Sequence, residues 1–305
     1  MEKNITRSLL IGMVLSFTST AHAISLTPTT DATTLVNNIT GSGITVTAGS
    51  QSFTGISNMA ATFTGGTDPV GFDSGIVLMT GDVNDIPGPN PTSSSPETEG
   101  SSFSGGTPDP DRILGVAGDS DLGTIVGTST HDAAVLEFEF QLGDGSAVSD
   151  LFFNFVFASE EYIDFVGSSF NDVFALFVDG ENIALIPGTS TPVAVNTVNG
   201  STNSAYYRNN VANTNGFGDL LLDSAFDGLT TVITATKLGL SAGLHSMKFA
   251  VADTADGRLD AAVFIQAGSF SNTNPGGNIP EPATLALMGI GLAGIGYRRR
   301  RFIRT

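Results

Sequence analysis

The residues most able to do chemistry form two acidic clusters, at 158–172 and 253–260. Each cluster directly follows a segment with the pattern of a strand, so both could lie at one edge of the same sheet structure. Calcium prefers six to eight oxygen ligands from carboxylates, amides and backbone carbonyls. The sequence therefore predicts a Ca²⁺ site, and the candidate ligands are Glu160, Asp164, Asp172, Asp253, Asp256 and Asp260.

The spacing of these acids is not that of an EF-hand loop, and a second interpretation stays open. Glu160 and Glu161 would point to opposite faces if the strand continued through them, so both can be ligands only if the chain bends there. In the alternative, the Asp and Asn residues cap turns, and the glutamates pair with Arg208 or Arg258.

An enzymatic interpretation of the same carboxylates is glycoside hydrolysis, which needs an Asp/Glu pair on opposite walls of a cleft. Adjacent Glu160 and Glu161 do not supply two opposed walls. The two histidines after residue 23 are His131 and His245. Neither lies in a Gly-x-Ser-x-Gly, HExxH or phosphate-loop motif. We therefore expect structural histidines and no catalytic residue, with a polysaccharide hydrolase as the alternative.

The elements that would position the carboxylates have mostly the pattern of strands. Residues 134–142 alternate between apolar and polar side chains, which predicts a half-buried strand, and residues 151–157 are apolar on both faces. Many short strands between Gly, Asn and Asp turns predict one antiparallel, jelly-roll-like β-sandwich over 24–271. Further strands are expected at 44–47, 75–79, 173–178, 182–186, 192–196, 229–236, 245–252 and 261–270, and a single short helix at 30–39, capped by Thr30 or Asp31.

A long segment at 87–111 interrupts the predicted strands. It is rich in Pro, Ser and Gly, which resist regular structure. A loop of this length inside a compact domain is typically functional or disordered. We expect a mobile surface flap here.

The first 23 residues have the pattern of a secretory signal peptide. Lys3 and Arg7 precede a ten-residue apolar run at 8–17, and an A-x-A sequence ends at Ala23. This order predicts cleavage after Ala23 by signal peptidase. The apolar run is shorter than the roughly 20 residues that a membrane span needs. A buried N-terminal helix is the alternative.

The C-terminal residues form a second signal of a different kind. A linker at 272–279 precedes the tail at 280–305, in which uncharged residues at 283–297 predict an apolar helix. A basic cluster after such a helix stays on the cytoplasmic side, so we expect transient insertion into the inner membrane. A plain anchor is the alternative, although fifteen residues are marginal for a span. The motif residues are Pro280, Glu281, Pro282, Arg298, Arg299, Arg300 and Arg301.

The body between the two signals is strongly acidic. Once residues 1–23 and the tail leave, five basic residues remain against 28 acidic ones, a formal charge of −23. This charge repels nucleic acid and anionic lipid, because both are bound through cations, and it favours divalent cations. In the alternative, the charge serves only solubility outside the cell. The chain has no cysteine, so disulfides and thiolate metal sites are excluded, and its 21 phenylalanines indicate an aromatic core.

The tail resembles the PEP-CTERM sorting signal, because Pro280-Glu281-Pro282, an apolar segment and an arginine cluster stand in that order. The resemblance implies a Gram-negative host that makes an exopolysaccharide. It also implies an exosortase, which would remove the tail near the Pro-Glu-Pro motif. The body would then be released or transferred to the cell surface.

The body is similar to the choice-of-anchor L domain. The resemblance is carried by Ser74 to Gly81, by Ser159-Glu160-Glu161-Tyr162, by Phe170 to Phe174 and by Ala250 to Asp253. It implies an extracellular β domain without a settled activity. We therefore expect a cell-surface or biofilm-matrix protein that acts by binding or as a structural component, with exopolysaccharide or other surface proteins as candidate partners and Ca²⁺ as a candidate stabilising ion.

Overall fold

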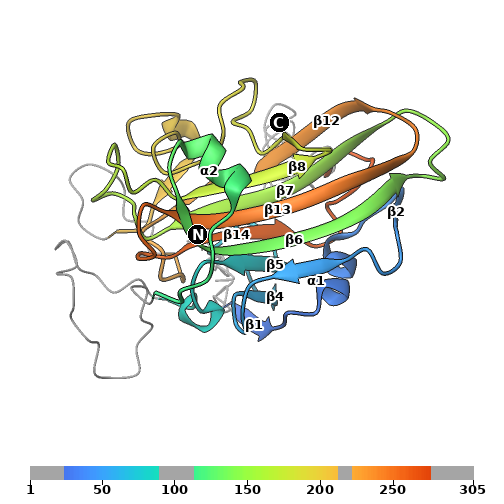
Figure 1. Ribbon diagram of the computed structural model, residues 1–305. Helices are drawn as coiled ribbons and strands as arrows, with labels where there is room; N and C mark the ends of the chain where they lie inside the picture. Colours follow the sequence, from blue (N-terminus) through green and yellow to red (C-terminus); the bar gives the residue numbers. More distant parts are fainter. Residues whose placement is uncertain (1–23, 89–112, 212–221, 276–305) are drawn as a thin grey trace, which may run out of the picture.

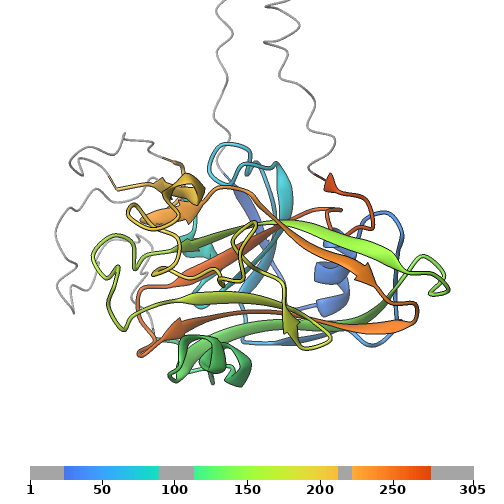
Figure 2. The same ribbon diagram turned by 90° about the horizontal axis from the view of Figure 1, so that it is seen from above.

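The computed structural model describes residues 24–88, 113–211 and 222–275. In these residues two antiparallel sheets pack face to face, and the two layers are separated most clearly when seen from above (Figures 1 and 2). The expected all-β sandwich is confirmed. The signal peptide, nearly all of the predicted flap at 87–111 and the helix expected at 283–297 lie outside the described residues.

The larger sheet has the order β1-β4-β5-β14-β7-β11-β10, with β12 paired to β7 beside β11. Its central strands are long and buried because the sheet is covered on both faces. The strands are β1 (Ser25–Pro28), β4 (Ala60–Thr64), β5 (Ser74–Met79), β7 (Ser149–Ser159), β10 (Tyr207–Asn209), β11 (Gly228–Thr230), β12 (Ile233–Leu240) and β14 (Ala261–Gln266).

The smaller sheet has the order β2-β6-β13-β8-β9, with β3 also paired to β6. The alternation predicted at 134–142 is confirmed in β6, where Leu136, Phe138 and Phe140 are buried while Glu137 and Glu139 are exposed. The strands are β2 (Ile44–Val46), β3 (Ser52–Thr54), β6 (Thr130–Leu142), β8 (Val173–Val178), β9 (Glu181–Asn182) and β13 (Leu244–Thr254).

Two α-helices lie against the sheets, and only the first was expected. Helix α1 (Ala32–Ile39) begins at Asp31, whose side chain accepts the Thr33 N–H, and it buries Leu35 and Ile39. The expectation of a single helix in the body was wrong, because α2 (Ser120–Val126) covers the outer face of the smaller sheet. Two short 3₁₀ turns, η1 (Val83–Asp85) and η2 (Ser204–Tyr206), complete the described elements.

Helix α2 is short and depends on its two ends. The Asp119 carboxylate accepts the N–H groups of Asp121 and Leu122, and Gly127 ends the helix with φ +77°. Lys248 of β13 binds Asp119 at 2.6 Å and Asp121 at 2.7 Å. These contacts hold α2 on the sheet.

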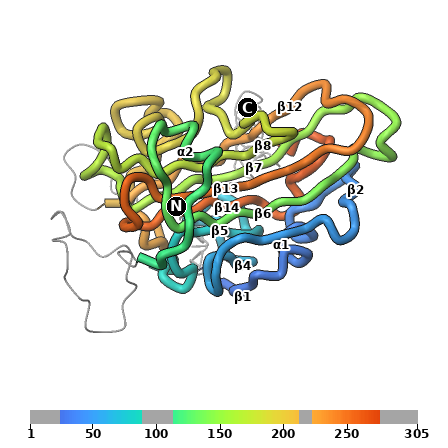
Figure 3. The backbone as a smooth tube through the Cα atoms, viewed as in Figure 1, coloured from blue at the N-terminus to red at the C-terminus, as the bar shows by residue number. Residues whose placement is uncertain are grey.

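Three of the expected strands differ in the structure. The strand expected at 229–236 is two strands, β11 and β12, which both pair with β7. Asn182 belongs to β9, but residues 183–186 and 192–196 form a loop whose isolated bridges join Leu185 to Pro192 and Val173 to Ala194. Short backbone pairings of this kind give the same local sequence pattern as a strand. Figure 3 traces the chain through these turns.

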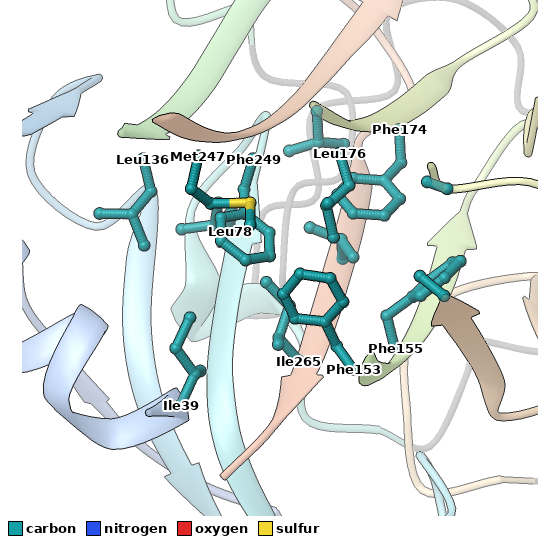
Figure 4. Packing of buried hydrophobic residues seen from close by; sticks show 14 of the residues in the cluster. Ile39, Leu78, Leu136, Phe153, Phe155, Phe174, Leu176, Met247, Phe249 and Ile265 are labelled. Atoms are coloured by element: carbon teal, nitrogen blue, oxygen red, sulfur yellow. The ribbon is translucent and has the colours of Figure 1, made fainter. Parts of the chain in front are cut away.

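Aromatic and aliphatic side chains from both sheets fill the space between the layers (Figure 4). The Phe153 ring lies 5.5 Å from Phe249 of the opposite sheet and 5.1 Å from Phe270. Such aromatic pairs add about 0.5–1.5 kcal/mol each beyond the burial of their area. The labelled core residues are Ile39, Leu78, Leu136, Phe153, Phe155, Phe174, Leu176, Met247, Phe249 and Ile265.

Candidate functional site

One end of the sandwich brings together several strand ends from both sheets. The end of β7 lies beside the start of β14, since Ser159 pairs with Ala261, and the end of β5 lies on the other side of β14. In the smaller sheet, the end of β13 lies between the starts of β6 and β8. The connection from β13 to β14 carries residues 255–260 from one sheet to the other. This topology confirms that the two acidic clusters lie at the same end.

Four carboxylates gather at this end and are almost completely shielded from solvent. We call them the acidic end cluster, and none of them is more than 1% exposed. Each lies at the end or the start of a different strand, because Glu161 follows β7, Asp172 precedes β8, Asp253 is near the end of β13 and Asp260 precedes β14. The cluster therefore exists only in the folded chain. Its members are Glu161, Asp172, Asp253 and Asp260.

Hydrogen bonds fix Asp172 at the centre of the cluster. The Ser159 hydroxyl donates to Asp172 Oδ2 at 3.0 Å, and the Thr254 N–H donates to Oδ1 at 3.2 Å. The same Ser159 oxygen accepts the Glu161 N–H at 2.9 Å. The chain therefore turns at Ser159, and this turn directs Glu161 into the protein interior.

The carboxylate oxygens of Asp253 and Glu161 have fewer hydrogen bonds than those of Asp172. Both carboxylate oxygens of Asp253 and the Oε2 atom of Glu161 are buried without a hydrogen-bond partner of ordinary geometry. The Thr80 hydroxyl lies near enough to Asp253 to lower its pKa in part. An unpartnered buried polar group costs about 1–3 kcal/mol, and more if it is charged. The acidic end cluster is therefore a costly feature of an otherwise apolar interior.

The pKa values of these carboxyl groups are raised, and burial is the main cause. Burial, with the charges of Asp172 and Asp256, raises the pKa of Glu161 to about 9. Burial raises the pKa of Asp172 to about 8, although the Ser159 and Thr254 hydrogen bonds act in the opposite direction. Burial and the charges of Asp172 and Asp260 raise the pKa of Asp253 well above its ordinary value. The charges that raise these pKa values are all carboxylates.

The structure places the six predicted calcium ligands in two groups. Asp172, Asp253 and Asp260 lie together in the acidic end cluster. Asp164 is exposed, while Glu160 and Asp256 are half-buried. The Asp256 charge still reaches the cluster, because it contributes to the raised pKa values of Glu161 and Asp172.

Sequence reasoning missed two contributors to this end of the sandwich. Glu161 enters the cluster because of the turn at Ser159, although Glu160 was the predicted ligand. Thr80 directly follows β5 and is 181 residues from Ala261 of β14, and its hydroxyl accepts the Ala261 N–H at 2.9 Å. The Ser159 and Glu161 pair was a visible signal, since a serine two residues before a buried acid can accept its N–H and turn the chain.

Among the described residues, no group of three or more His, Cys, Asp or Glu side chains is arranged to hold a metal. The donor set is nevertheless composed only of oxygens, which is the kind of set that calcium and magnesium prefer. A cation would need rotation of the less constrained carboxylates toward a common point.

His245 and a hollow beside α2 bear on the enzymatic alternative. His245 is buried, with Nδ1 2.7 Å from Asp179 and Nε2 2.9 Å from the Ser241 carbonyl oxygen, so both ring nitrogens serve structure. A hollow of about 550 Å³ beside α2 is lined by small residues and one carboxylate, Asp119, which is paired with Lys248. It lacks the two opposed carboxylates that glycoside hydrolysis needs.

Comparison with known proteins matches both parts of the chain. The family model described as the choice-of-anchor L domain matches residues 23–271, and the PEP-CTERM protein-sorting motif matches residues 278–301. No curated protein and no solved structure matches the chain. Within the described ranges, no helix has the length and hydrophobicity to cross a membrane.

Proposed function

This chain belongs to the choice-of-anchor L domain family, and we propose that it acts outside the cell by binding or as a structural component, not as an enzyme. The PEP-CTERM signal indicates an exported protein that an exosortase processes and that reaches the cell surface or the extracellular space. The function therefore has to be carried by the β-sandwich, as a cell-surface or biofilm-matrix component. Exopolysaccharide or other surface proteins are its proposed partners.

The burial of the acidic end cluster is the observation that carries this proposal. Glu161, Asp172, Asp253 and Asp260 are the carboxylates that the fold gathers, and all four are closed off from solvent. A polysaccharide chain needs an open cleft with acids on both walls. A buried cluster instead supports a role in holding the domain together, and we include Ca²⁺ as the ion that stabilises it.

The experiment that tests this function uses the exported protein, purified after processing by its host, and the host's own exopolysaccharide. We expect the protein to sediment with the polysaccharide or with the cell surface and to leave the length of the polysaccharide unchanged. Size-exclusion chromatography of the polysaccharide before and after incubation measures that length. Shortening of the chains would support the alternative of a matrix hydrolase and overturn the non-enzymatic role.

The role of the tail is tested separately. Deletion of residues 280–305 removes the sorting motif but leaves every described residue in place. We expect the deleted protein to lose its normal processing and its final location, as followed with an internal tag. Unchanged processing and location would show that this tail is not what sends the body to the surface.

A further inference from the structure

We propose that Glu161, Asp172, Asp253 and Asp260 close around one Ca²⁺ ion inside the end of the sandwich, where the ion ties β7, β8, β13 and β14 together. The proposal rests on the calcium stabilisation included in the proposed function and identifies its site. It differs from the ligand set expected from the sequence, because Glu161 replaces Glu160, and Asp164 and Asp256 are left out.

The first argument is the unmet hydrogen bonding of buried side chains. Asp253 is fully buried, and both of its carboxylate oxygens lack a hydrogen-bond partner of ordinary geometry, as does Glu161 Oε2. Buried charges in proteins are normally paired or coordinate a metal.

The second argument is the sign of the surrounding charge. Besides burial, the charges of Asp172, Asp260 and Asp132 of β6 raise the pKa of Asp253. Besides burial, the charges of Asp172 and Asp256 raise the pKa of Glu161. The charges that act on these two groups are all negative, so a divalent cation at the centre would relieve several repulsions at once.

The third argument is that neighbouring residues fix the positions of two of the carboxylates. Asp172 is fixed by Ser159 and Thr254, so it offers a rigid first ligand. The Asp260 carboxylate packs against Gly81, where a Cβ atom would collide with it. The glycine therefore leaves the space that this carboxylate occupies.

The chemistry of the donors favours calcium over other common ions. The four proposed ligands supply oxygen only, which suits calcium and magnesium better than zinc or copper. Magnesium demands near-ideal octahedral geometry and keeps several waters, whereas calcium accepts an irregular shell of six to eight oxygens. A closed site with carboxylates from four strand ends fits the second description. Extracellular calcium modules commonly work with dissociation constants of about 10⁻⁴–10⁻³ M.

The test compares thermal unfolding of the exported protein after refolding in a chelator, in Ca²⁺ or in Mg²⁺. Refolding is included because a closed site exchanges its ion slowly. At a calcium concentration about 100 times the dissociation constant, we expect the Tm to rise by roughly 5–10 °C. Magnesium should give a much smaller rise. Elemental analysis of the refolded protein should find one calcium per chain.

Three variants locate the ion. Asp253→Asn keeps the shape of the side chain and removes its charge, so we expect it to fold in chelator and to lose the Tm shift. Glu161→Gln should weaken calcium binding at least tenfold and serves as the second variant if Asp253→Asn does not fold. Asp164→Asn is the matched control, because it removes the same charge from an exposed member of the first acidic cluster, and it should keep the full shift.

The outcomes separate this site from the proposed function. A full calcium shift in folded Asp253→Asn and Glu161→Gln would overturn the site while leaving calcium stabilisation in place elsewhere. A wild-type protein that binds no calcium and shows no shift would overturn both the site and the stabilisation. Neither result would touch the surface role, which depends on location and on the polysaccharide experiment.

Discussion

Phe153 in the middle of the sandwich and Asp253 at its end are equally shielded from solvent, but their surroundings are opposite. Phe153 lies between the rings of Phe249 and Phe270, in a layer built of matching apolar surfaces. Asp253 lies among carboxylates and has two buried oxygens without a hydrogen bond. One region contributes stability through burial, and the other reduces it unless something neutralises the charge.

This difference indicates that the acidic end cluster serves a purpose other than the stability of the fold. Sequences that fold well agree with physical rules nearly everywhere and depart from them at functional or strained positions. The aromatic core follows those rules throughout. The acidic end cluster departs from them at Asp253 and Glu161, although the same strands supply both regions. A cation bound after export would make the acidic end cluster stabilise the folded state, which it otherwise destabilises.

The largest expected effect is in the aromatic core. Phe153→Ala removes a ring of the larger sheet that contacts Phe249 of the smaller sheet, and we expect the free energy of unfolding to fall by about 3–5 kcal/mol. Urea denaturation of the exported protein measures this loss. The calcium shift of the Tm should survive, because the ring takes no part in the cluster.

Phe165→Ala is the matched control for that variant. Phe165 is only half-buried and makes its ring contact with Phe170 near the surface, at 5.3 Å. We expect a loss of about 1 kcal/mol or less. Equal losses for Phe153→Ala and Phe165→Ala would contradict the division of the molecule into a stabilising core and a costly end.

The second effect is the dependence of stability on pH in the presence of a chelator. The folded-state pKa values of Glu161 and Asp172 are raised to about 9 and about 8, above ordinary carboxyl values near 4. Between these limits the folded state holds more protons than the unfolded state, so stability falls as the pH rises. The slope is about 1.4 kcal/mol per pH unit for each extra proton, so each of the two groups contributes about 3 kcal/mol between pH 5.5 and 7.5.

Chemical denaturation at the two pH values checks this slope, and Phe153→Ala provides the control. That variant should be weaker at both pH values but keep the same slope, because the core residue does not titrate. A wild-type protein in chelator that is more stable at pH 7.5 than at pH 5.5 would show that the carboxylates of the cluster are ionised and satisfied in the folded state.

The third effect tests the packing of the cluster. In Gly81→Ala the new methyl group collides with the Asp260 carboxylate, and we expect a loss of about 1–3 kcal/mol. In an Asp260→Ala background the collision is absent, so the same substitution should cost much less. A double-mutant cycle from urea denaturation measures the difference. Additive losses would mean that Gly81 and Asp260 do not share this space.

The sequence predicted what depends on local pattern. The alternation at 134–142 gave β6, and the apolar run at 151–157 gave β7, because each pattern records how many faces of a strand are buried. The sequence pattern did not predict helix α2, because a seven-residue helix depends on its caps and on Lys248, which is far away in the sequence. The strand expected at 229–236 is divided because β11 and β12 both lie against β7.

The candidate site was predictable in outline but not in detail. Two acidic segments after strands were enough to place Asp172, Asp253 and Asp260 at the same end. The choice between Glu160 and Glu161 was decided by the Ser159 turn, and strand alternation cannot show that turn. Thr80 and Gly81 directly follow β5, and only the strand order brings them there.

The smallest effect compares a partnered carboxylate with the unpartnered ones. Asp119 accepts two N–H groups at the start of α2 and binds Lys248, so Asp119→Ala should cost about 1 kcal/mol in chelator and in calcium alike. Asp253→Asn should have the opposite sign in chelator, because burial and the charges of Asp172 and Asp260 oppose an ionised carboxylate at this position, whereas the amide is neutral in both the folded and the unfolded state. It should become the weaker protein only when calcium is added. Urea denaturation of both variants under both conditions measures these signs. If Asp253→Asn also costs stability in chelator, the Asp253 carboxylate is satisfied without a cation, and the acidic end cluster resembles the rest of the interior more than its unpartnered oxygens suggest.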